Sequence, residues 1–172
     1  MVTVEKLSVS MIEIKGSKFL SHLIPMHDLE STLEQLRKNH PKAVHWVYAY
    51  RMYNDLDQLV EFSTDDGEPK GTSGKPTLSV MQGHEIVNAA IITVRYFGGT
   101  KLGPGGLVRA YADSANEVIS GTEFVLYEKY LQKNYECLYS HLSMLEYELT
   151  QVAVRIIKKE FLFIFLKKFI SK

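Results

Sequence analysis

Residues 95–116 have the sequence RYFGGTKLGPGGLVRAYADSAN, and this stretch decides the fold of the chain. The run before it, NAAIITV at 88–94, is apolar on both faces until Arg95, which predicts a central strand of a sheet. After the glycines, apolar residues recur at helical spacing until Gly121, which predicts a helix that this glycine ends. Those helix positions are Leu107, Ala110, Tyr111, Ser114 and Val118.

The chain before this stretch alternates between strand and helix patterns. Alternating apolar residues at 11–25 are broken at Lys15-Gly16-Ser17, which predicts two strands joined by a turn or bulge. The same periodicities predict four further elements. These are a helix at 27–41 that Pro41 stops, a strand at 45–52, a turn into a strand at 54–63, and a helix at 77–84 that follows the polar loop TDDGEPKGTSGKP at 64–76.

The pattern changes near residue 122, which predicts a domain of residues 1–122 and a second, smaller α+β unit of residues 123–172. In this second unit we expect a strand at 130–139, a helix at 140–151, and two strands at 152–161 and 161–166. Two or three strands and one helix make a poor core by themselves. The second unit is therefore expected to be incomplete.

The chain is neutral, with 20 basic and 20 acidic side chains, but its charges are unevenly placed. Between residues 69 and 111 the basic residues outnumber the acidic ones, which favours an anionic ligand for this half. The bases are Lys70, Lys75, Arg95, Lys101 and Arg109, against Glu85. The single cysteine, the lack of a signal-peptide pattern and the lack of an apolar run of about 20 residues predict a cytoplasmic protein without a membrane partner.

Both glycine clusters, at 67–74 and 98–106, lie just before a predicted helix. The N–H groups and dipole at a helix start attract anions, and glycine allows close approach of the backbone. The alternative is that the glycines supply tight turns and close packing. Neither cluster has the spacing of a Walker loop or of Gly-x-Gly-x-x-Gly, so a dedicated nucleotide site is disfavoured. The residues alone leave anion binding open.

Two other groups of side chains have both a chemical and a structural interpretation. The acids Asp65, Asp66 and Glu68 could hold a divalent cation, but a solvated turn is the commoner use of such a cluster. The aromatic row Trp46, Tyr48 and Tyr50 could stack nucleic-acid bases, but one wall of a hydrophobic core is commoner. The histidines form no ligand pattern and no nucleophile has a base partner, so we predict no metal, no cofactor and no catalytic residue.

Three motifs together, KGSKF, FSTDDGEPKGTSGKP and VRYFGGTKLGPGGLVRAY, closely resemble the YigZ/IMPACT family, also called uncharacterised protein family UPF0029. The resemblance covers roughly residues 10–120, as the family's N-terminal domain. It implies a two-layer α+β sandwich like the second domain of a small-subunit ribosomal protein. Residues 125–170 resemble the start of a ferredoxin-like domain whose last helix and strand are missing here, as in a truncated or frameshifted chain.

Eukaryotic members of this family regulate translation by binding a ribosome-associated activator of an initiation-factor kinase. The resemblance therefore implies a non-catalytic module that binds RNA, the ribosome or a translation-associated protein. The alternative is an enzyme that acts on a phosphorylated or nucleotide ligand at the glycine-rich loops. The predicted binding residues are Lys70, Lys75, Arg95, Tyr96, Gly98, Gly99, Lys101, Gly103, Gly105, Gly106 and Arg109. The signature loop that shares their surface comprises Asp65, Asp66, Gly67, Glu68, Pro69, Gly71 and Gly74.

Overall fold

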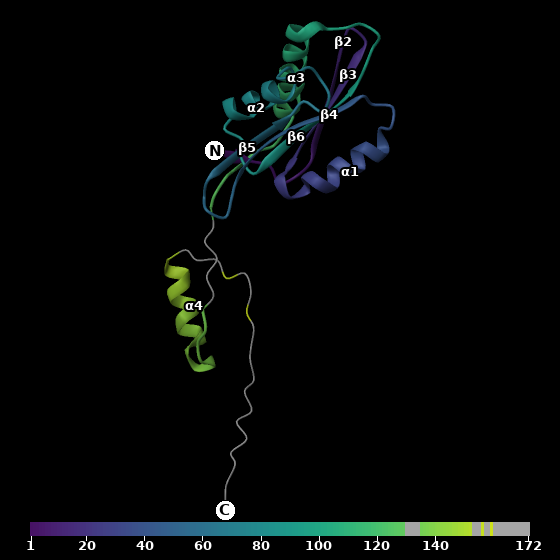
Figure 1. Cartoon of the computed structure of the whole chain (residues 1–172). Coiled ribbons are helices and arrows are strands. Elements are labelled where there is room, and N and C mark those ends of the chain that lie inside the picture. The colour runs from purple at the N-terminus through teal and green to yellow at the C-terminus, as the bar shows by residue number, and fades with distance from the viewer. Residues whose placement is uncertain (130–134, 153–155, 157–158, 160–172) are drawn as a thin grey trace, which may run out of the picture. The chain divides into compact units, whose positions relative to one another are not determined.

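The structure, a computed structural model, describes residues 1–129, 135–152, 156 and 159. The chain divides into two compact units, residues 1–129 and residues 130–172 (Figure 1). Among the described residues no helix combines the length and apolar composition needed to cross a membrane. The first unit contains the sheet and three of the α-helices, and the second contains one described helix.

The first unit is built on a five-stranded antiparallel sheet with the strand order β2-β3-β6-β4-β5 (Figure 1). All five strands predicted for this unit are confirmed. They are the pair joined by the turn at Lys15-Gly16-Ser17, the strands predicted at 45–52 and 54–63, and the strand that precedes the glycines. Their bounds are β2 Ser8–Ile14, β3 Ser17–Pro25, β4 His45–Tyr53, β5 Leu59–Thr64 and β6 Ala89–Tyr96.

The middle position of β6 explains its unusual composition. Every residue from Ala89 to Arg95 is buried, because strands lie on both sides of β6 and helices cover both of its faces. Ile91 packs in the core beneath α2 (Gly74–Gly83) and α3 (Gly103–Ser120), whereas Ile92 packs beneath α1 (Leu29–Asn39). The predicted central strand is therefore confirmed.

The helices lie on opposite faces of the sheet, with α2 and α3 on one face and α1 on the other (Figure 1). The α+β class is confirmed. The predicted two-layer sandwich is the sheet with α2 and α3, and α1 adds a helix to the opposite face. Pro104 occupies the first turn of α3, where its missing N–H costs no helical hydrogen bond, and Gly121 follows the last turn as predicted.

A small second sheet closes the first unit. It pairs β1 (Val2–Thr3) with β7 (Val125–Leu126) in antiparallel register. Phe124 packs against the core cluster beneath α2 and α3, and the ring of Tyr127 stacks on Tyr53 with centroids 5.5 Å apart. Residues beyond 122 therefore contribute to the fold of the first unit.

The described part of the second unit contains a 3-10 turn at Tyr139–His141 and the helix α4 at Leu142–Gln151. The predicted helix at 140–151 is confirmed. The described residues of the predicted strand at 130–139, which are 135–139, do not form a strand. The predicted strands at 152–161 and 161–166 lie almost entirely outside the described residues.

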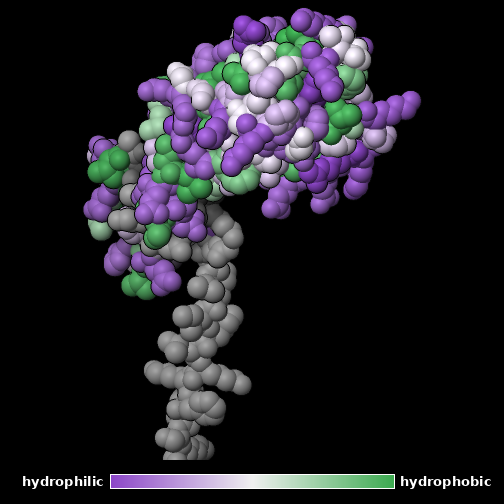
Figure 2. Space-filling model, turned by 45° about the horizontal axis from the view of Figure 1, so that its top comes forward, coloured by the Kyte–Doolittle hydropathy of each residue, from purple (hydrophilic) through white to green (hydrophobic). Residues whose placement is uncertain are grey.

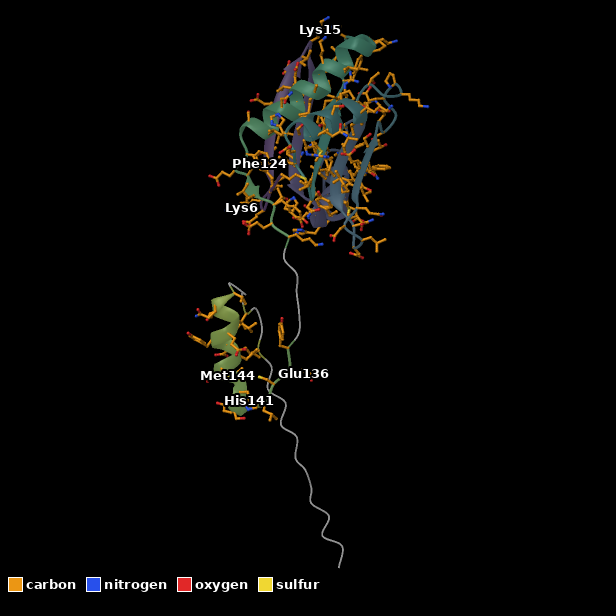
Figure 3. The ribbon with its side chains drawn as sticks, turned by 90° about the vertical axis from the view of Figure 1, so that its left-hand side faces the viewer. Lys6, Lys15, Phe124, Glu136, His141 and Met144 are labelled. Carbon is orange, nitrogen blue, oxygen red and sulfur yellow. The ribbon has the colours of Figure 1, made fainter. Side chains whose placement is uncertain are left out.

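The antiparallel order brings several chain turns to one end of the sheet, which we call the Gly98 end. The turn between β2 and β3, the start of β4 and the ends of β5 and β6 meet there. Helices α2 and α3 begin at this end, whereas α1 begins at the opposite end. Figure 3 shows Lys15 at the Gly98 end, with Lys6 and Phe124 at the opposite end of the first unit.

Candidate functional site

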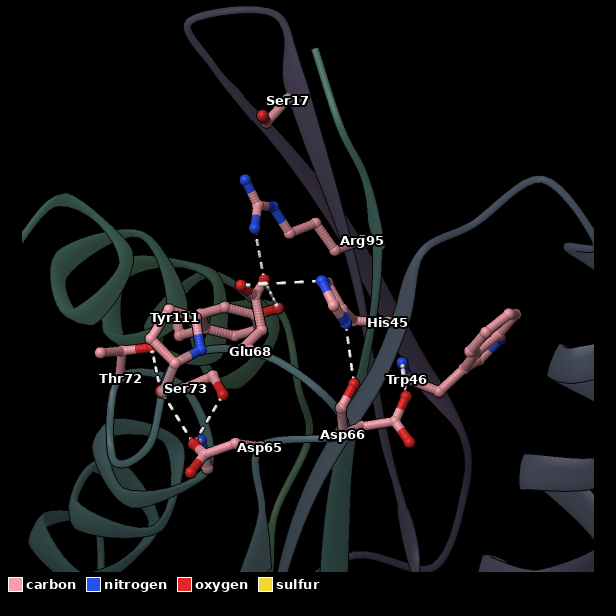
Figure 4. Close-up of polar contacts among 12 residues, drawn as sticks. Ser17, His45, Trp46, Asp65, Asp66, Glu68, Thr72, Ser73, Arg95 and Tyr111 are labelled. Carbon is pink, nitrogen blue, oxygen red and sulfur yellow. Dashed lines mark hydrogen bonds and ion pairs between the residues drawn. The ribbon is translucent and has the colours of Figure 1, made fainter. Parts of the chain in front are cut away.

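The centre of the Gly98 end is a buried carboxylate, Glu68, which contacts the side chains of Arg95, Tyr111 and His45 (Figure 4). Its Oε1 accepts hydrogen bonds from the Arg95 guanidinium and, at 2.8 Å, from the Tyr111 hydroxyl. Its Oε2 lies 3.7 Å from Nε2 of His45. The Glu68 and Arg95 side chains are only 3% and 6% exposed, so each charge depends on the other for compensation.

Burial and the adjacent Glu68 carboxylate both raise the pKa of Tyr111 above its ordinary value, which keeps its hydroxyl protonated as a donor. The Arg95 guanidinium also lies over two aromatic rings, 5.4 Å from the centroid of Phe19 and 5.9 Å from that of Phe97. Arg95 therefore belongs to the interior. The expectation that it contributes its charge to an exposed basic surface is wrong in this respect.

Asp65 closes the start of α2 instead of facing solvent. Its Oδ2 accepts the N–H of Gly71 at 2.7 Å, and its Oδ1 accepts the N–H and hydroxyl of Ser73 and the N–H of Gly74. Although burial opposes it, this set of hydrogen bonds lowers the pKa of Asp65 below its ordinary value. The carboxylate thus satisfies N–H groups that a helix start otherwise leaves unpaired.

Asp66 ties the same loop to the strand β4. Its Oδ2 accepts the N–H of Trp46 at 2.6 Å, and its carbonyl accepts a hydrogen bond from Nδ1 of His45 at 2.7 Å. The second carboxylate oxygen of Asp66, Oδ1, lies 3.7 Å from the Arg37 guanidinium. All three acids of the signature loop are therefore held by donors of the protein. Within the described residues, no three His, Cys, Asp or Glu side chains are grouped to hold a metal ion.

Two of the predicted glycines are required by close packing. A Cβ on Gly98 would lie 1.9 Å from the carbonyl carbon of Gly16, in the turn between β2 and β3. The Gly98 N–H also donates to Oγ of Ser17 at 3.1 Å. A Cβ on Gly74 would lie 2.7 Å from the carbonyl oxygen of Thr64. The structural interpretation of the glycines therefore holds at these positions.

Three of the other glycines near the start of α3, Gly99, Gly103 and Gly105, face open space. Gly99 and Gly103 have φ values of +85° and +72°, which favour glycine. Gly105 has neither a positive φ nor a neighbour within 4 Å of an added Cβ. Gly106 lies against Leu102. Among the described residues no side-chain hydrogen bond caps the start of α3, so the N–H groups of Gly103, Gly105 and Gly106 are available to a ligand.

The predicted cations Lys70, Lys75, Lys101 and Arg109 are all exposed at the Gly98 end. Sequence reasoning missed further exposed cations there, because nothing in their local sequence places them at this end. They are Lys15 and Lys18 around the β2–β3 turn, Arg37 and Lys38 at the end of α1, and Lys42. Figure 2, which turns this end forward, shows predominantly hydrophilic and near-neutral residues on it. Glu13 is exposed nearby and lies opposite Lys18 in register.

Exposed acids gather at the end of the sheet opposite the Gly98 end. They lie in the turn between β4 and β5, after α2 and around the end of α3. The exposed bases Lys6 and Lys129 lie at this end too. The acids are Asp55, Asp57, Glu85, Glu117 and Glu123. The first unit is therefore electrically polarised along its sheet. At the Gly98 end, the acids of the loops turn inward while their lysines stay outside.

Of the remaining predicted residues, Tyr96 lies apart from these cations, and the others form turns of the signature loop. Tyr96 is half-buried, and its hydroxyl is 2.7 Å from Nδ1 of His40, beside α1. Gly67 and Gly71 have φ values of +88° and +77° and shape the turns of the signature loop, and Pro69 is exposed in it. His45 and Tyr111 were not predicted as site residues. The position of Arg95 at the end of an otherwise apolar strand was the available signal that a partner must lie nearby.

Comparison with known proteins identifies the family. A model of the Impact N-terminal domain matches residues 15–119. This chain belongs to the IMPACT family. It is 33% identical to an IMPACT family member of Haemophilus influenzae over 87% of this chain and 74% of that protein. It is 34% identical to the IMPACT family member YigZ of Escherichia coli, with the same coverage of both chains.

A solved structure titled "Crystal structure of an hypothetical protein" matches with a TM-score of 0.66 and 29% identity, over 94% of this chain and 80% of that one. The predicted resemblance to the YigZ/IMPACT family is thereby confirmed. The residues matched by the IMPACT-family model include Glu68 with its neighbours His45, Arg95 and Tyr111, both glycine loops and all of the exposed cations named at the Gly98 end.

Proposed function

We propose that this chain is a non-catalytic binding module of the translation apparatus or its regulation, and that its Gly98 end binds the phosphate backbone of RNA. The observation that carries the proposal is the sorting of charge within the segment 65–75, which contains the signature loop. Asp65, Asp66 and Glu68 are held by internal donors, while Lys70 and Lys75 of the same segment remain exposed. The link to translation comes from the IMPACT family.

Exposed lysines and arginines bind phosphate mainly through charge, and the uncapped start of α3 adds N–H donors beside Lys101 and Arg109. Because Gly105 has no internal contact that requires glycine, its small size is consistent with close approach of a ligand to this helix start. Cations on several separate segments suit an extended polyanion better than a single small anion.

A fluorescence-anisotropy titration with a labelled single-stranded RNA tests the proposal. We expect Lys101→Gln and Arg109→Gln each to weaken binding severalfold, because each removes a phosphate contact. Lys6→Gln is the matched control, since Lys6 is exposed at the opposite end. Equal affinity of all four proteins would contradict the proposal.

The alternative, an enzyme acting on a phosphorylated or nucleotide ligand, is disfavoured by the commitment of Asp65 to the start of α2. Its oxygens already accept four hydrogen bonds, so it is poorly placed to hold magnesium. A thermal-shift screen of nucleotides with magnesium separates the two functions. A nucleotide that raises the melting temperature only with magnesium, and whose effect added RNA does not remove, would favour the enzyme.

A further inference from the structure

A groove of about 370 Å³ lies between α1 and the strands β4 and β5, on the sheet face away from α2 and α3. Its floor is aromatic, with Tyr48 and Tyr50 from β4 and Phe62 from β5, and Leu33 of α1 forms part of its wall. The prediction that Tyr48 and Tyr50 form a wall of the core is confirmed, since both pack against the cluster beneath α1. α1 nevertheless leaves part of this floor open.

The aromatic floor forms a ladder of three rings. The centroid of Phe62 lies 5.4 Å from that of Tyr50, with nearly parallel planes, and 5.8 Å from that of Tyr48. Phe62 remains 42% exposed despite these contacts. Aromatic faces that remain accessible in this way attract cations as well as apolar groups.

The ionisable side chains that line the groove are one acid, Glu30, and one histidine, His27, in contrast to the basic Gly98 end. The exposed carboxylate of Glu30 lines it, and no lysine or arginine lines it among the described residues. His27, which also lines it, lies 3.6 Å from the Asp28 carboxylate. A carboxylate beside exposed aromatic faces is complementary to a lysine or arginine side chain and repels phosphate.

The strand that contributes Phe62 is an edge of the sheet. The N–H of Tyr53 points away from β5, because it donates to Oδ1 of Asn88 at 2.9 Å. Since backbone groups alternate in direction along a strand, the register then turns the N–H and C=O groups of Glu61 and Ser63 outward. No strand of the described part lies beyond them, so they are available to an added strand.

We propose that this groove binds an extended peptide segment of a protein partner that carries a lysine or arginine. The peptide backbone pairs with the outer side of β5, and its cationic side chain reaches back over the ring of Phe62 toward Glu30. This inference goes beyond the proposed function, because it concerns another face of the sheet and a ligand of opposite charge.

The experiment uses the full chain and two capped peptides, Val-Arg-Val-Arg-Val and Val-Glu-Val-Glu-Val, followed by backbone-amide NMR. We expect the arginine peptide to shift amides of β5 and the first turn of α1, and the glutamate peptide to shift neither. N-methylation of alternate peptide nitrogens should abolish binding, because it removes the donors that pair with β5.

Two exposed positions test the side-chain contacts. Glu30→Gln and Phe62→Ala should each weaken binding of the arginine peptide about threefold or more. Glu117→Gln, an exposed acid of α3, is the control and should leave the affinity unchanged. Unshifted β5 amides, equal binding of the two peptides, or full affinity of both variants would overturn the proposal. So would displacement of the arginine peptide from this groove by an oligouridylate.

Discussion

The carboxylate of Glu68 and the guanidinium of Arg95 form an ion pair with side chains only 3% and 6% exposed, between the loop after β5 and the end of β6. This pair fixes the signature loop to the sheet. Asp65 accepts hydrogen bonds from the start of α2, and Asp66 accepts one from β4. Together with the ion pair, these contacts direct the acids of the loop inward. The exposed Lys70 and Lys75 are thereby left to define the charge of the surface.

Removing one partner of this ion pair should destabilise the domain. Arg95→Ala leaves a buried carboxylate without its compensating charge, and we expect a loss of about 3–5 kcal/mol in the free energy of unfolding. Urea denaturation followed by circular dichroism measures this loss. The double variant Glu68→Gln, Arg95→Met should be more stable than Arg95→Ala. Wild-type stability of Arg95→Ala with weakened RNA binding would instead make Arg95 a surface ligand.

Two glycines of the same loop should respond oppositely to alanine. Gly98→Ala forces a Cβ into the backbone of Gly16 and should lower the melting temperature by several degrees. Gly105→Ala meets no atom within 4 Å in the first turn of a helix, and should raise stability by up to about 1 kcal/mol. Differential scanning calorimetry compares them. Similar losses at both positions would contradict the packing account.

The cap formed by Asp65 predicts a pH dependence. Because the pKa of Asp65 is lowered by folding, its stabilisation is complete above the ordinary aspartate pKa of about 3.9 and is lost as the pH falls through the lower folded-state value. Asp65→Asn should therefore be less stable than wild type at pH 6, and the difference should shrink below about pH 4. Unfolding at both pH values checks this; a difference that does not change with pH would refute the cap.

Local patterns sufficed to predict the five strands of the main sheet and the helices α1, α2 and α3, because each has an apolar pattern of its own. The short strands β1 and β7 were not predicted, since two residues show no period. The central position of β6 followed from its apolar run, which does not alternate and therefore indicates burial on both faces. The cap on α2 was hidden, since Asp65 precedes the helix by a loop and lies outside the usual capping spacing. A local pattern contains no information about such a contact.

The candidate site was only partly predictable for the same reason. The sequence places Lys70, Lys75, Lys101 and Arg109 in glycine-rich segments, and their exposure agrees with the predicted surface. Lys15 and Lys18 join them only because the sheet order brings the β2–β3 turn beside Gly98. The burial of Arg95 depends on Glu68, a long-range partner that sequence spacing does not reveal.

Truncation should locate the boundary of the first unit. A chain ending at Lys129 should unfold at nearly the wild-type temperature of this unit, because it keeps the contacts of Phe124 and the β1–β7 pairing. A chain ending at Thr122 loses both, and we expect it to be less stable by about 1–2 kcal/mol. Thermal unfolding of the two truncated proteins compares them. Equal stability would place the boundary at residue 122.

The salt dependence of RNA binding tests the central claim most directly, because each phosphate contact with single-stranded RNA contributes about 0.7 to the slope of log K against log salt concentration. The account predicts a steep negative slope for the wild type. In the variant with glutamine at positions 70, 75, 101 and 109, the slope should be shallower by about 2–3. A wild-type affinity that does not change with salt, or the same slope in both proteins, would contradict the account.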